Sequence, residues 1–210
     1  MSHVLARVSG FGWTVVPHYP FRFQRVGGDE RALHVERRGS TPTAATLYFE
    51  ATPPRVELGL GARSIDDVCD LTPSDVRGDF KVETTVFTIG WPAEFDLVST
   101  DPGGPSVFDF ASDDGGLLYV QGPLARARVP KLEAMCAPGQ RVVDRGTHAT
   151  GEWVELAYEH DGRAHWQRHT TVAWGHDEFL IVTAQSPAER ISSVRAAAIY
   201  ASATLAPWRE

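Results

Sequence analysis

One β-hairpin in the last third of the chain constrains the fold more than any other feature. Residues 152–160 (EWVELAYEH) alternate in period two, which is typical of a β-strand. The pair Asp161-Gly162 comes next and suits a type I′ turn, because both central residues of that turn need positive φ. The chain returning from this turn is therefore predicted to pair with residues 152–160 in one fixed register.

The two-residue turn decides which residues face each other across the hairpin. The predicted pairs are His160 with Arg163, Tyr158 with His165, Leu156 with Gln167, Glu155 with Arg168, and Val154 with His169. The opposite charges of Glu155 and Arg168 favour this register. If exposed, that ion pair would contribute at most about 1 kcal/mol.

Each face of the predicted hairpin carries a candidate binding surface. One face holds three tryptophans, which belong either to the core under a covering helix or to a ligand groove or partner surface: Trp153, Trp166 and Trp174. The opposite face is either solvated sheet or a polar docking surface, made of Tyr158, His160, Arg163, His165, Gln167 and His169.

A closing helix is predicted over residues 187–206, after a mostly buried strand at residues 178–184. Ser186 suits the N-cap, Pro187 the first helical position, and Glu189 completes a capping box. Apolar and small residues then recur at helical spacing: Ile191, Val194, Ala198, Ala201 and Leu205. The predicted fold class is α+β, an antiparallel sheet covered by a long C-terminal helix, with a strand-rich extension before it.

The first part of the chain reads as short strands separated by glycine and proline turns, which indicates an antiparallel meander. A short helix is predicted at Ser64–Leu71, where two aspartates fall in the first turn. A second short helix is predicted at Pro130–Cys136. We expect two parts, residues 1–80 as a separate small domain or a sheet extension, and residues 81–210 as the main domain.

Charge and hydropathy narrow the classes of partner. The net charge of −7 argues against nucleic acid or an anionic membrane as the main partner. No apolar run approaches the roughly 20 residues of a membrane span, so we expect a soluble protein. The first residues lack a basic region followed by an apolar run, which predicts a cytoplasmic protein unless a signal segment has been removed.

The residue patterns of common active sites are missing from the sequence, so we expect no catalytic residues and no cofactor. It contains no nucleophile elbow, phosphate-binding loop or dinucleotide fingerprint. Cys69 and Cys136 are expected to be inert, because Asp66 and Asp70 disfavour a thiolate at Cys69. A small basic cluster lies on a predicted loop and consists of Arg126, Arg128 and Lys131. It is either a solvated loop or a contact for an acidic partner.

The eight histidines raise the question of a metal site. His165 and His169 are four residues apart on one strand, which separates them by roughly 13 Å. Two ligands of one ion, each about 2 Å from it, cannot span that distance. No metal site is therefore predicted.

The order of segments from Val86 onward resembles that of a known superfamily. It runs VFTIGWPAEFDLV, FDF, LLYVQGP, VPKLEAM, the hairpin, GHDEFLIVTAQSP and a closing helix. This order, over residues of about 82–208, resembles the PsbP-like superfamily of bacterial and organellar proteins, which includes a Ran-binding import factor and DcrB-like proteins. The chain has Trp91-Pro92 but lacks the tryptophan that usually follows the proline. The resemblance implies an antiparallel sheet sandwiched by helices.

Members of that superfamily are mostly non-enzymatic, so the resemblance implies binding to another protein. We therefore expect a chaperone, adaptor or inhibitor-type partner that is not an enzyme. The alternative is a small-molecule binder of helix-grip-like architecture, in which helix and sheet enclose an apolar cavity. Trp153, Trp166 and Trp174 separate the two: they line a cavity in the binder and pack on the helix in the adaptor.

Overall fold

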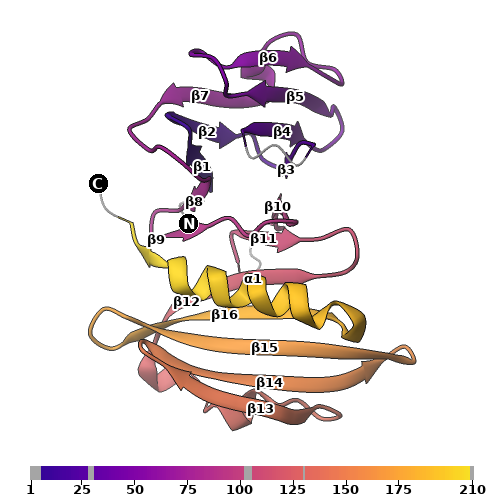
Figure 1. Ribbon diagram of the computed structural model, residues 1–210, viewed down its shortest axis with the longest axis vertical. Helices are drawn as coiled ribbons and strands as arrows, with labels where there is room; N and C mark the ends of the chain where they lie inside the picture. The colour runs from indigo at the N-terminus through magenta and orange to yellow at the C-terminus, as the bar shows by residue number, and fades with distance from the viewer. Residues whose placement is uncertain (1–5, 28–30, 102–105, 130, 209–210) are drawn as a thin grey trace. The chain divides into compact units, whose positions relative to one another are not determined.

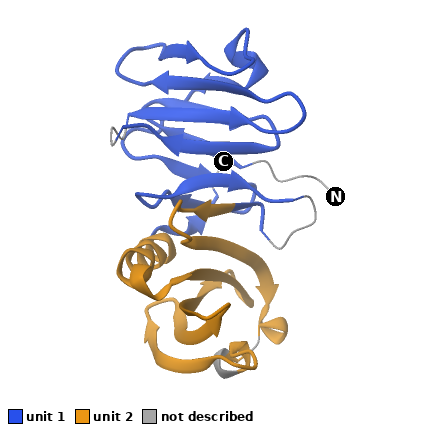
Figure 2. Cartoon of the chain, turned by 90° about the vertical axis from the view of Figure 1, so that its right-hand side faces the viewer, with its two compact units in different colours: residues 1–108, 204–210 blue, residues 109–203 orange. Residues whose placement is uncertain are grey.

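The computed structural model describes residues 6–27, 31–101, 106–129 and 131–208. The chain forms two compact units, one of Met1–Phe108 with Thr204–Glu210 and one of Asp109–Ala203, called unit 1 and unit 2 (Figure 2). The boundary expected near residue 80 falls inside unit 1. Pro130, the first residue of the second predicted short helix, lies outside the described residues.

Unit 1 consists of short antiparallel strands in two sets (Figure 1). The first set has the order β17-β9-β8-β1-β2-β7. Its strands are β17 (Ala206–Pro207), β9 (Phe87–Gly90), β8 (Lys81–Glu83), β1 (Arg7–Gly10), β2 (Trp13–Pro17) and β7 (Cys69–Pro73). The second has the order β10 (Asp96–Ser99), β3 (Phe21–Arg25), β4 (Ala32–Arg37), β5 (Thr43–Tyr48) and β6 (Arg55–Leu58).

Aromatic rings fill the core of unit 1. The Phe80 ring lies 5.6 Å from that of Phe49 and 6.0 Å from that of Trp91, and Phe23 lies 6.3 Å from Trp91. Trp91 is 1% exposed, and its indole Nε1 donates a hydrogen bond to the carbonyl of Phe95 at 2.7 Å. The period-two apolar residues of β3, β4 and β5 supply the facing side chains: Phe21, Phe23, Leu33, Val35 and Leu47.

Unit 2 is built on long antiparallel strands in the order β13-β14-β15-β16-β12-β11. These are β13 (Arg141–His148), β14 (Gly151–His160), β15 (Arg163–Trp174), β16 (Glu178–Pro187), β12 (Leu117–Ala125) and β11 (Phe108–Ala111). All five predicted pairs across the β14–β15 hairpin are confirmed. Asp161 and Gly162 have φ of 50° and 72°, the positive values that the predicted turn requires.

One face of this sheet is covered by α1 (Ile191–Thr204) (Figure 1). Small residues and Val194 form the buried side of the helix: Val194, Ala197, Ala198 and Ala201. The register places Trp166, Val182 and Ala184 on one sheet face, and all three are buried. Figure 1 shows α1 drawn across the strands of this sheet, and its Arg195 side chain reaches Glu155 of β14 and the Trp166 ring of β15.

The predicted α+β class is wrong, because the protein is mainly β. Strands are the main secondary structure of both units, and α1 is the one α-helix of the described residues. The remaining helical segments are single 3₁₀ turns: η1 (Ile65–Asp67), η2 (Arg126–Arg128), η3 (Leu132–Met135) and η4 (Ala188–Arg190). A sheet sandwiched between helices is therefore not what this chain forms.

Pairing between strands explains why the expected helices are shorter. The predicted helix Ser64–Leu71 ends at Asp67, because Cys69 pairs with Pro17 as the start of β7. The closing helix begins at Ile191 instead of Pro187, because Pro187 still pairs with His165 at the end of β16. Sheet pairing therefore overrides the capping signal of Ser186 and Pro187, whereas Ser64 is the N-cap of η1 with Asp66 and Asp67 in its first turn, as predicted. No helix of the described residues is long and apolar enough to cross a bilayer.

Candidate functional site

A buried carboxylate joins α1 to the sheet of unit 2. Glu155 is 1% exposed, and Arg195 of α1 donates to it through Nε at 2.9 Å and Nη2 at 2.5 Å. Arg168 Nη1 donates to Oε1 at 2.8 Å, and Trp166 Nε1 donates to Oε2 at 3.0 Å. Four donors from three residues therefore satisfy one carboxylate, here called the Glu155 cluster.

The electrostatics of the Glu155 cluster keep the acid ionised. Burial raises the pKa of Glu155, but hydrogen bonds from Arg195, Trp166 and Arg168 more than offset this, so its pKa lies below the ordinary value. Burial lowers the pKa of Arg168, against the opposing effect of Glu155. An arginine stays protonated in proteins, so two cations share one anion.

Trp153 supports the cluster from the neighbouring position on β14. The Arg168 guanidinium lies 4.2 Å from the centre of the Trp153 ring, a cation–π geometry. Gly146 of β13 pairs with Trp153, and a Cβ at Gly146 would stand 2.7 Å from the indole Cζ2. Glycine at this position therefore makes room for the indole that covers Arg168.

A pocket of about 580 Å³ opens beside the cluster, between the start of α1 and strands β13 to β15. Its lining consists of Gly139, Arg141, Val143, Ala157, Tyr158, Glu159, Ala164, His165, Trp166, Ala188, Ile191 and Arg195. Ala157 pairs with Trp166 on one side and with Arg141 on the other. The small Ala157 side chain thus leaves space between larger groups.

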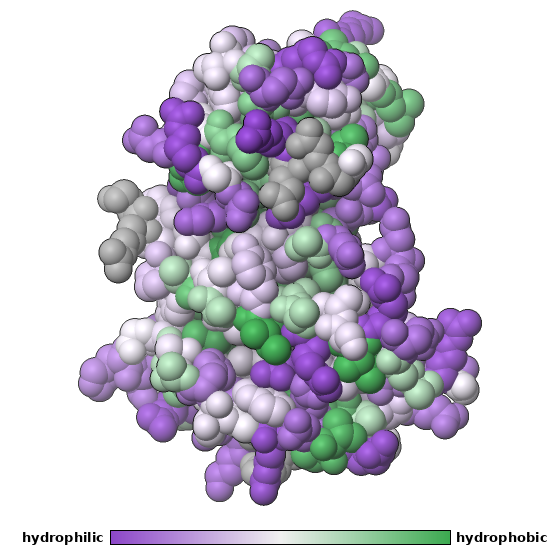
Figure 3. All heavy atoms as spheres, in the orientation of Figure 1, coloured by the Kyte–Doolittle hydropathy of each residue, from purple (hydrophilic) through white to green (hydrophobic). Residues whose placement is uncertain are grey.

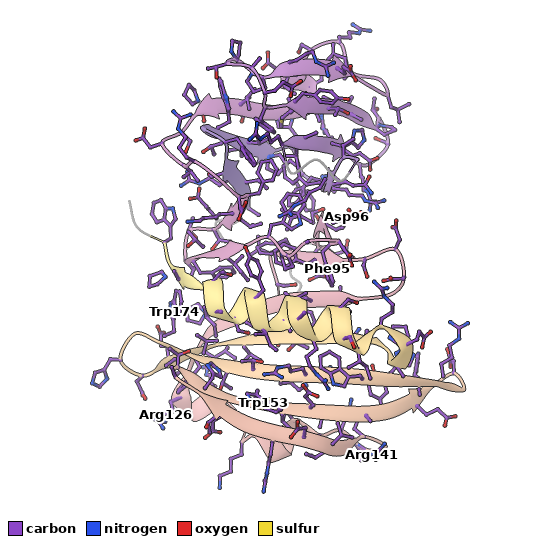
Figure 4. The ribbon with its side chains drawn as sticks, viewed as in Figure 1. Phe95, Asp96, Arg126, Arg141, Trp153 and Trp174 are labelled. Atoms are coloured by element: carbon purple, nitrogen blue, oxygen red, sulfur yellow. The ribbon has the colours of Figure 1, made fainter. Side chains whose placement is uncertain are left out.

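The pocket combines an apolar surface with two guanidinium groups. Trp166, Ile191 and the alanines supply the apolar part, and Arg141 and Arg195 the cations. Within the described part of the chain, the exposed Arg141 side chain has no hydrogen-bond or ion-pair partner. Figure 4 labels Arg141 on β13 and Trp153 on β14. Such a lining suits a group with both an apolar body and a negative charge.

β13, at the outer end of the sheet, forms one wall of the pocket. Residues 141–145 are all exposed, with Val142 at 44% and Val143 at 41%. Val142 pairs with Leu156 and Asp144 with Glu155, so Val143 is the extra residue of a β-bulge and also lines the pocket. Figure 3 shows apolar side chains gathered on the surface toward the hairpin end of β13 and β14.

The three predicted tryptophans have different environments. Trp166 is 2% exposed and lines the pocket together with Ile191 of α1. Trp153 is half-buried against Arg168, and Trp174 is half-buried at the far end of β15 (Figure 4). One member of the set therefore meets the pocket, and it belongs at the same time to the Glu155 cluster.

The predicted polar surface on the opposite face is made of two parts. Tyr158 stacks on His165 at 5.3 Å, and His160 meets the His165 ring edge-on at 6.0 Å, close to exposed Arg163. Gln167 and His169, further along β15, are half-buried. Gln167 Oε1 accepts a hydrogen bond from Gln140 Nε2, and His169 Nδ1 lies 3.0 Å from Thr183 Oγ1.

His169 predicts a pH dependence of stability. Burial lowers its pKa to about 4, against about 6.5 for an unfolded chain. Between these values the unfolded chain binds more protons, so the free energy of unfolding falls as the pH is lowered from about 6.5 toward 4, by at most about 1.4 kcal/mol per pH unit. Urea denaturation at a series of pH values should show this fall in the free energy of unfolding of wild type. The free energy of unfolding of His169→Gln should depend less on pH. Exposed His160→Gln is the control, and parallel profiles for wild type and His169→Gln would contradict the assignment.

The other predicted groups lie apart from the pocket. Arg126, in η2, has its guanidinium 5.7 Å from the Phe179 ring centre, and Arg128 and Lys131 are exposed. Both cysteines are free, and burial, then Asp70 and Asp66, raises the pKa of Cys69 to about 12. Among the residues described, no three His, Cys, Asp or Glu side chains converge as metal ligands.

Sequence reasoning missed Arg141, Val143 and Arg195. Arg195 carried a usable signal, since it stands four residues after Ile191 and next to Val194, within the apolar stripe of the helix. A guanidinium beside the apolar stripe lies close to the sheet, and Glu155 lies on the sheet face beneath the helix. Arg141 and Val143 gave no comparable signal, because the bulge depends on pairing with β14.

The comparisons with known proteins assign no family to the chain. No family model matches it, and no curated protein matches its sequence. Among solved structures, LpqN, which is involved in cell envelope biogenesis of Mycobacterium tuberculosis, is similar with a TM-score of 0.43 and 13% sequence identity. The match covers 59% of this chain and 83% of LpqN. Similarity at this level carries no argument about function, and the PsbP-like resemblance stays a prediction.

Proposed function

We propose that the protein is a non-enzymatic binding protein whose unit 2 captures an extended segment of another protein along β13. The observation that carries the proposal is the position of the pocket, which lies directly beside an exposed terminal strand and takes Arg141 and Val143 from that strand. A chaperone, an adaptor and an inhibitor would all use such a surface.

Strand addition is a common way for a sheet to bind a peptide. Main-chain hydrogen bonds to the free edge supply affinity, and pockets for alternate side chains supply specificity. Within the described part of the chain, no strand pairs with the outer edge of β13. Alternate side chains of an added strand would stand on the face of the sheet where the pocket opens.

Features of β13 restrict which extended segments can pair with its free edge. Exposed edge strands are commonly protected by charges and bulges. β13 has both, with the bulge at Val143 and charges at Arg141, Asp144 and Arg145. A segment that pairs with β13 has to accommodate the bulge and complement these charges, which makes the edge selective.

A small-molecule binder is the second candidate, and the pocket itself favours it. Its volume of about 580 Å³ falls within the range of ligand sites, roughly 300–1,000 Å³. Trp166 and Ile191 supply an apolar surface between helix and sheet, as a helix-grip arrangement requires. Native mass spectrometry of the purified protein distinguishes this candidate, because a bound small molecule adds mass that is lost on denaturation.

Selection from a displayed peptide library tests the proposal. We expect extended peptides to be enriched, and we expect Val143→Asp to weaken their binding at least roughly tenfold, about 1.4 kcal/mol. Leu58→Asp, at an exposed apolar position on β6 of unit 1, is the matched control and should bind as wild type does. Hydrogen exchange should show protection of the β13 amides by the bound peptide. Enrichment of no peptide, or protection elsewhere, would overturn the proposal.

A further inference from the structure

Charge is unevenly distributed around the pocket. Three guanidinium groups, of Arg141, Arg168 and Arg195, and three carboxylates, of Asp144, Glu155 and Glu159, lie around the pocket, and exposed Asp144 pairs with Glu155 across β13 and β14. Glu155 is buried and its four hydrogen bonds come from protein donors, so it has little left to offer a ligand. The Arg195 side chain is 42% exposed and Arg141 is exposed, so both cations meet solvent at the pocket.

The cations are arranged around Ala157. Arg141 pairs with Ala157 from β13, Trp166 pairs with it from β15, and Arg195 of α1 binds Glu155, two residues before Ala157 on the same face. Glu159 lies two residues beyond Ala157, nearer the hairpin turn. Beside Ala157, the guanidinium groups of Arg141 and Arg195 supply positive charge, with Asp144 as the exposed anion beyond them at the Glu155 pair. Glu159 makes the turn side negative.

We propose that this space is a subsite for a carboxylate carried on an apolar stem, the side chain of a glutamate two residues from a large apolar residue in the captured segment, because residues two apart in a strand share one face. The carboxylate pairs with the Arg141 guanidinium, and the apolar residue lies toward Trp166 and Ile191. The inference rests on the proposed function, because it names the chemistry of the segment that β13 binds. It also sets direction, since Glu159 repels an acid placed at the turn side.

Arg141 suits this role better than Arg195. Arg195 already donates two hydrogen bonds to Glu155, whereas the Arg141 guanidinium has no hydrogen-bond or ion-pair partner within the described residues. A guanidinium binds a carboxylate through two parallel hydrogen bonds, which a neutral amide cannot match. The subsite should therefore distinguish an acid from its amide.

Matched peptides test the subsite. Each peptide enriched in the library selection is compared with a copy in which its glutamate is replaced by glutamine, using fluorescence anisotropy on the full chain. We expect wild type to prefer the acid by roughly tenfold, about 1.4 kcal/mol. Arg141→Gln should reduce this preference to less than about threefold, and Arg145→Gln, which pairs at a position on the other face of β13, should retain it.

A second variant tests the space itself. Ala157→Leu fills the gap between Trp166 and Arg141, so it should abolish the preference for the acid. Thermal unfolding of each variant shows whether it still folds, and the Arg141→Gln comparison does not depend on Ala157→Leu folding.

Three results would overturn the inference. If peptides protect the β13 amides but bind equally as acid and amide, the subsite is wrong and the proposed function stands. If peptides bind without protecting the β13 amides, the proposed function is wrong, and the subsite that rests on it is wrong as well. If octanoate binds with the same dependence on Arg141 and no peptide binds, the occupant is a free carboxylic acid and the peptide assignment is wrong.

Discussion

Glu155→Ala is expected to lower the free energy of unfolding by about 3–5 kcal/mol, because it leaves two guanidinium groups without the anion that balances them. Arg168 is 7% exposed and cannot turn to water without disturbing Trp153 and Trp166 around it. Arg195 loses its bidentate partner, and with it the ionic link between α1 and the sheet. Urea denaturation followed by tryptophan fluorescence measures the loss.

Two further variants separate the buried charge from simple side-chain truncation. Glu159→Ala removes an exposed carboxylate from the same strand and should change stability by no more than about 0.5 kcal/mol. Replacing Glu155, Arg168 and Arg195 together by leucine and methionine should recover much of the loss, because buried ion pairs often tolerate apolar replacement. If Glu155→Ala lowers the free energy of unfolding as little as Glu159→Ala does, the Glu155 cluster contributes little to stability.

Trp91→Ala is expected to lower the free energy of unfolding of unit 1 by about 3–5 kcal/mol, the usual range for truncation of a buried aromatic residue. The indole is 1% exposed, touches the rings of Phe23 and Phe80, and lies 5.3 Å from the Arg25 guanidinium. Truncation leaves a cavity and also removes the hydrogen bond that the Phe95 carbonyl accepts.

Hydrogen exchange is the right measurement for Trp91→Ala, since two compact units need not unfold in one step. Protection should fall at the amides of β3 and β9, which lie in unit 1. Trp91→Phe keeps an aromatic ring but lacks the Nε1 donor, so protection should fall less in this variant than in Trp91→Ala. Trp208→Ala, at a half-buried position, is the control. Equal protection in Trp91→Ala and Trp208→Ala would contradict the central place of Trp91 in the core.

The part of the fold that the sequence predicted best is the part decided locally. The β14–β15 register follows from a two-residue turn and a period of two, and both depend on adjacent residues only. The start of α1 was misplaced for the opposite reason. Ser186 and Pro187 have the chemistry of a helix start, but Pro187 lies across from His165, which is distant in sequence.

The candidate site was predicted only in part, for a related reason. Trp166 was identified because its face of the sheet was known, and the Glu155–Arg168 pair because the register was known. The sequence limited the contribution of that pair only for the case of an exposed site, and the structure shows that α1 covers the pair and adds Arg195. Arg141 belongs to a strand whose pairing shifts by one residue at Val143, and no local signal predicts such a shift.

The pairing of β17 with β9 has a consequence for synthesis on the ribosome. Unit 1 starts with the first residues of the chain, yet its terminal strand is Ala206–Pro207, which follows the whole of unit 2. Domains usually fold in order as they emerge, N-terminal part first. Here β9 lacks its β17 partner throughout the translation of residues 109–203. The first sheet of unit 1 is therefore completed only after unit 2 has been synthesised.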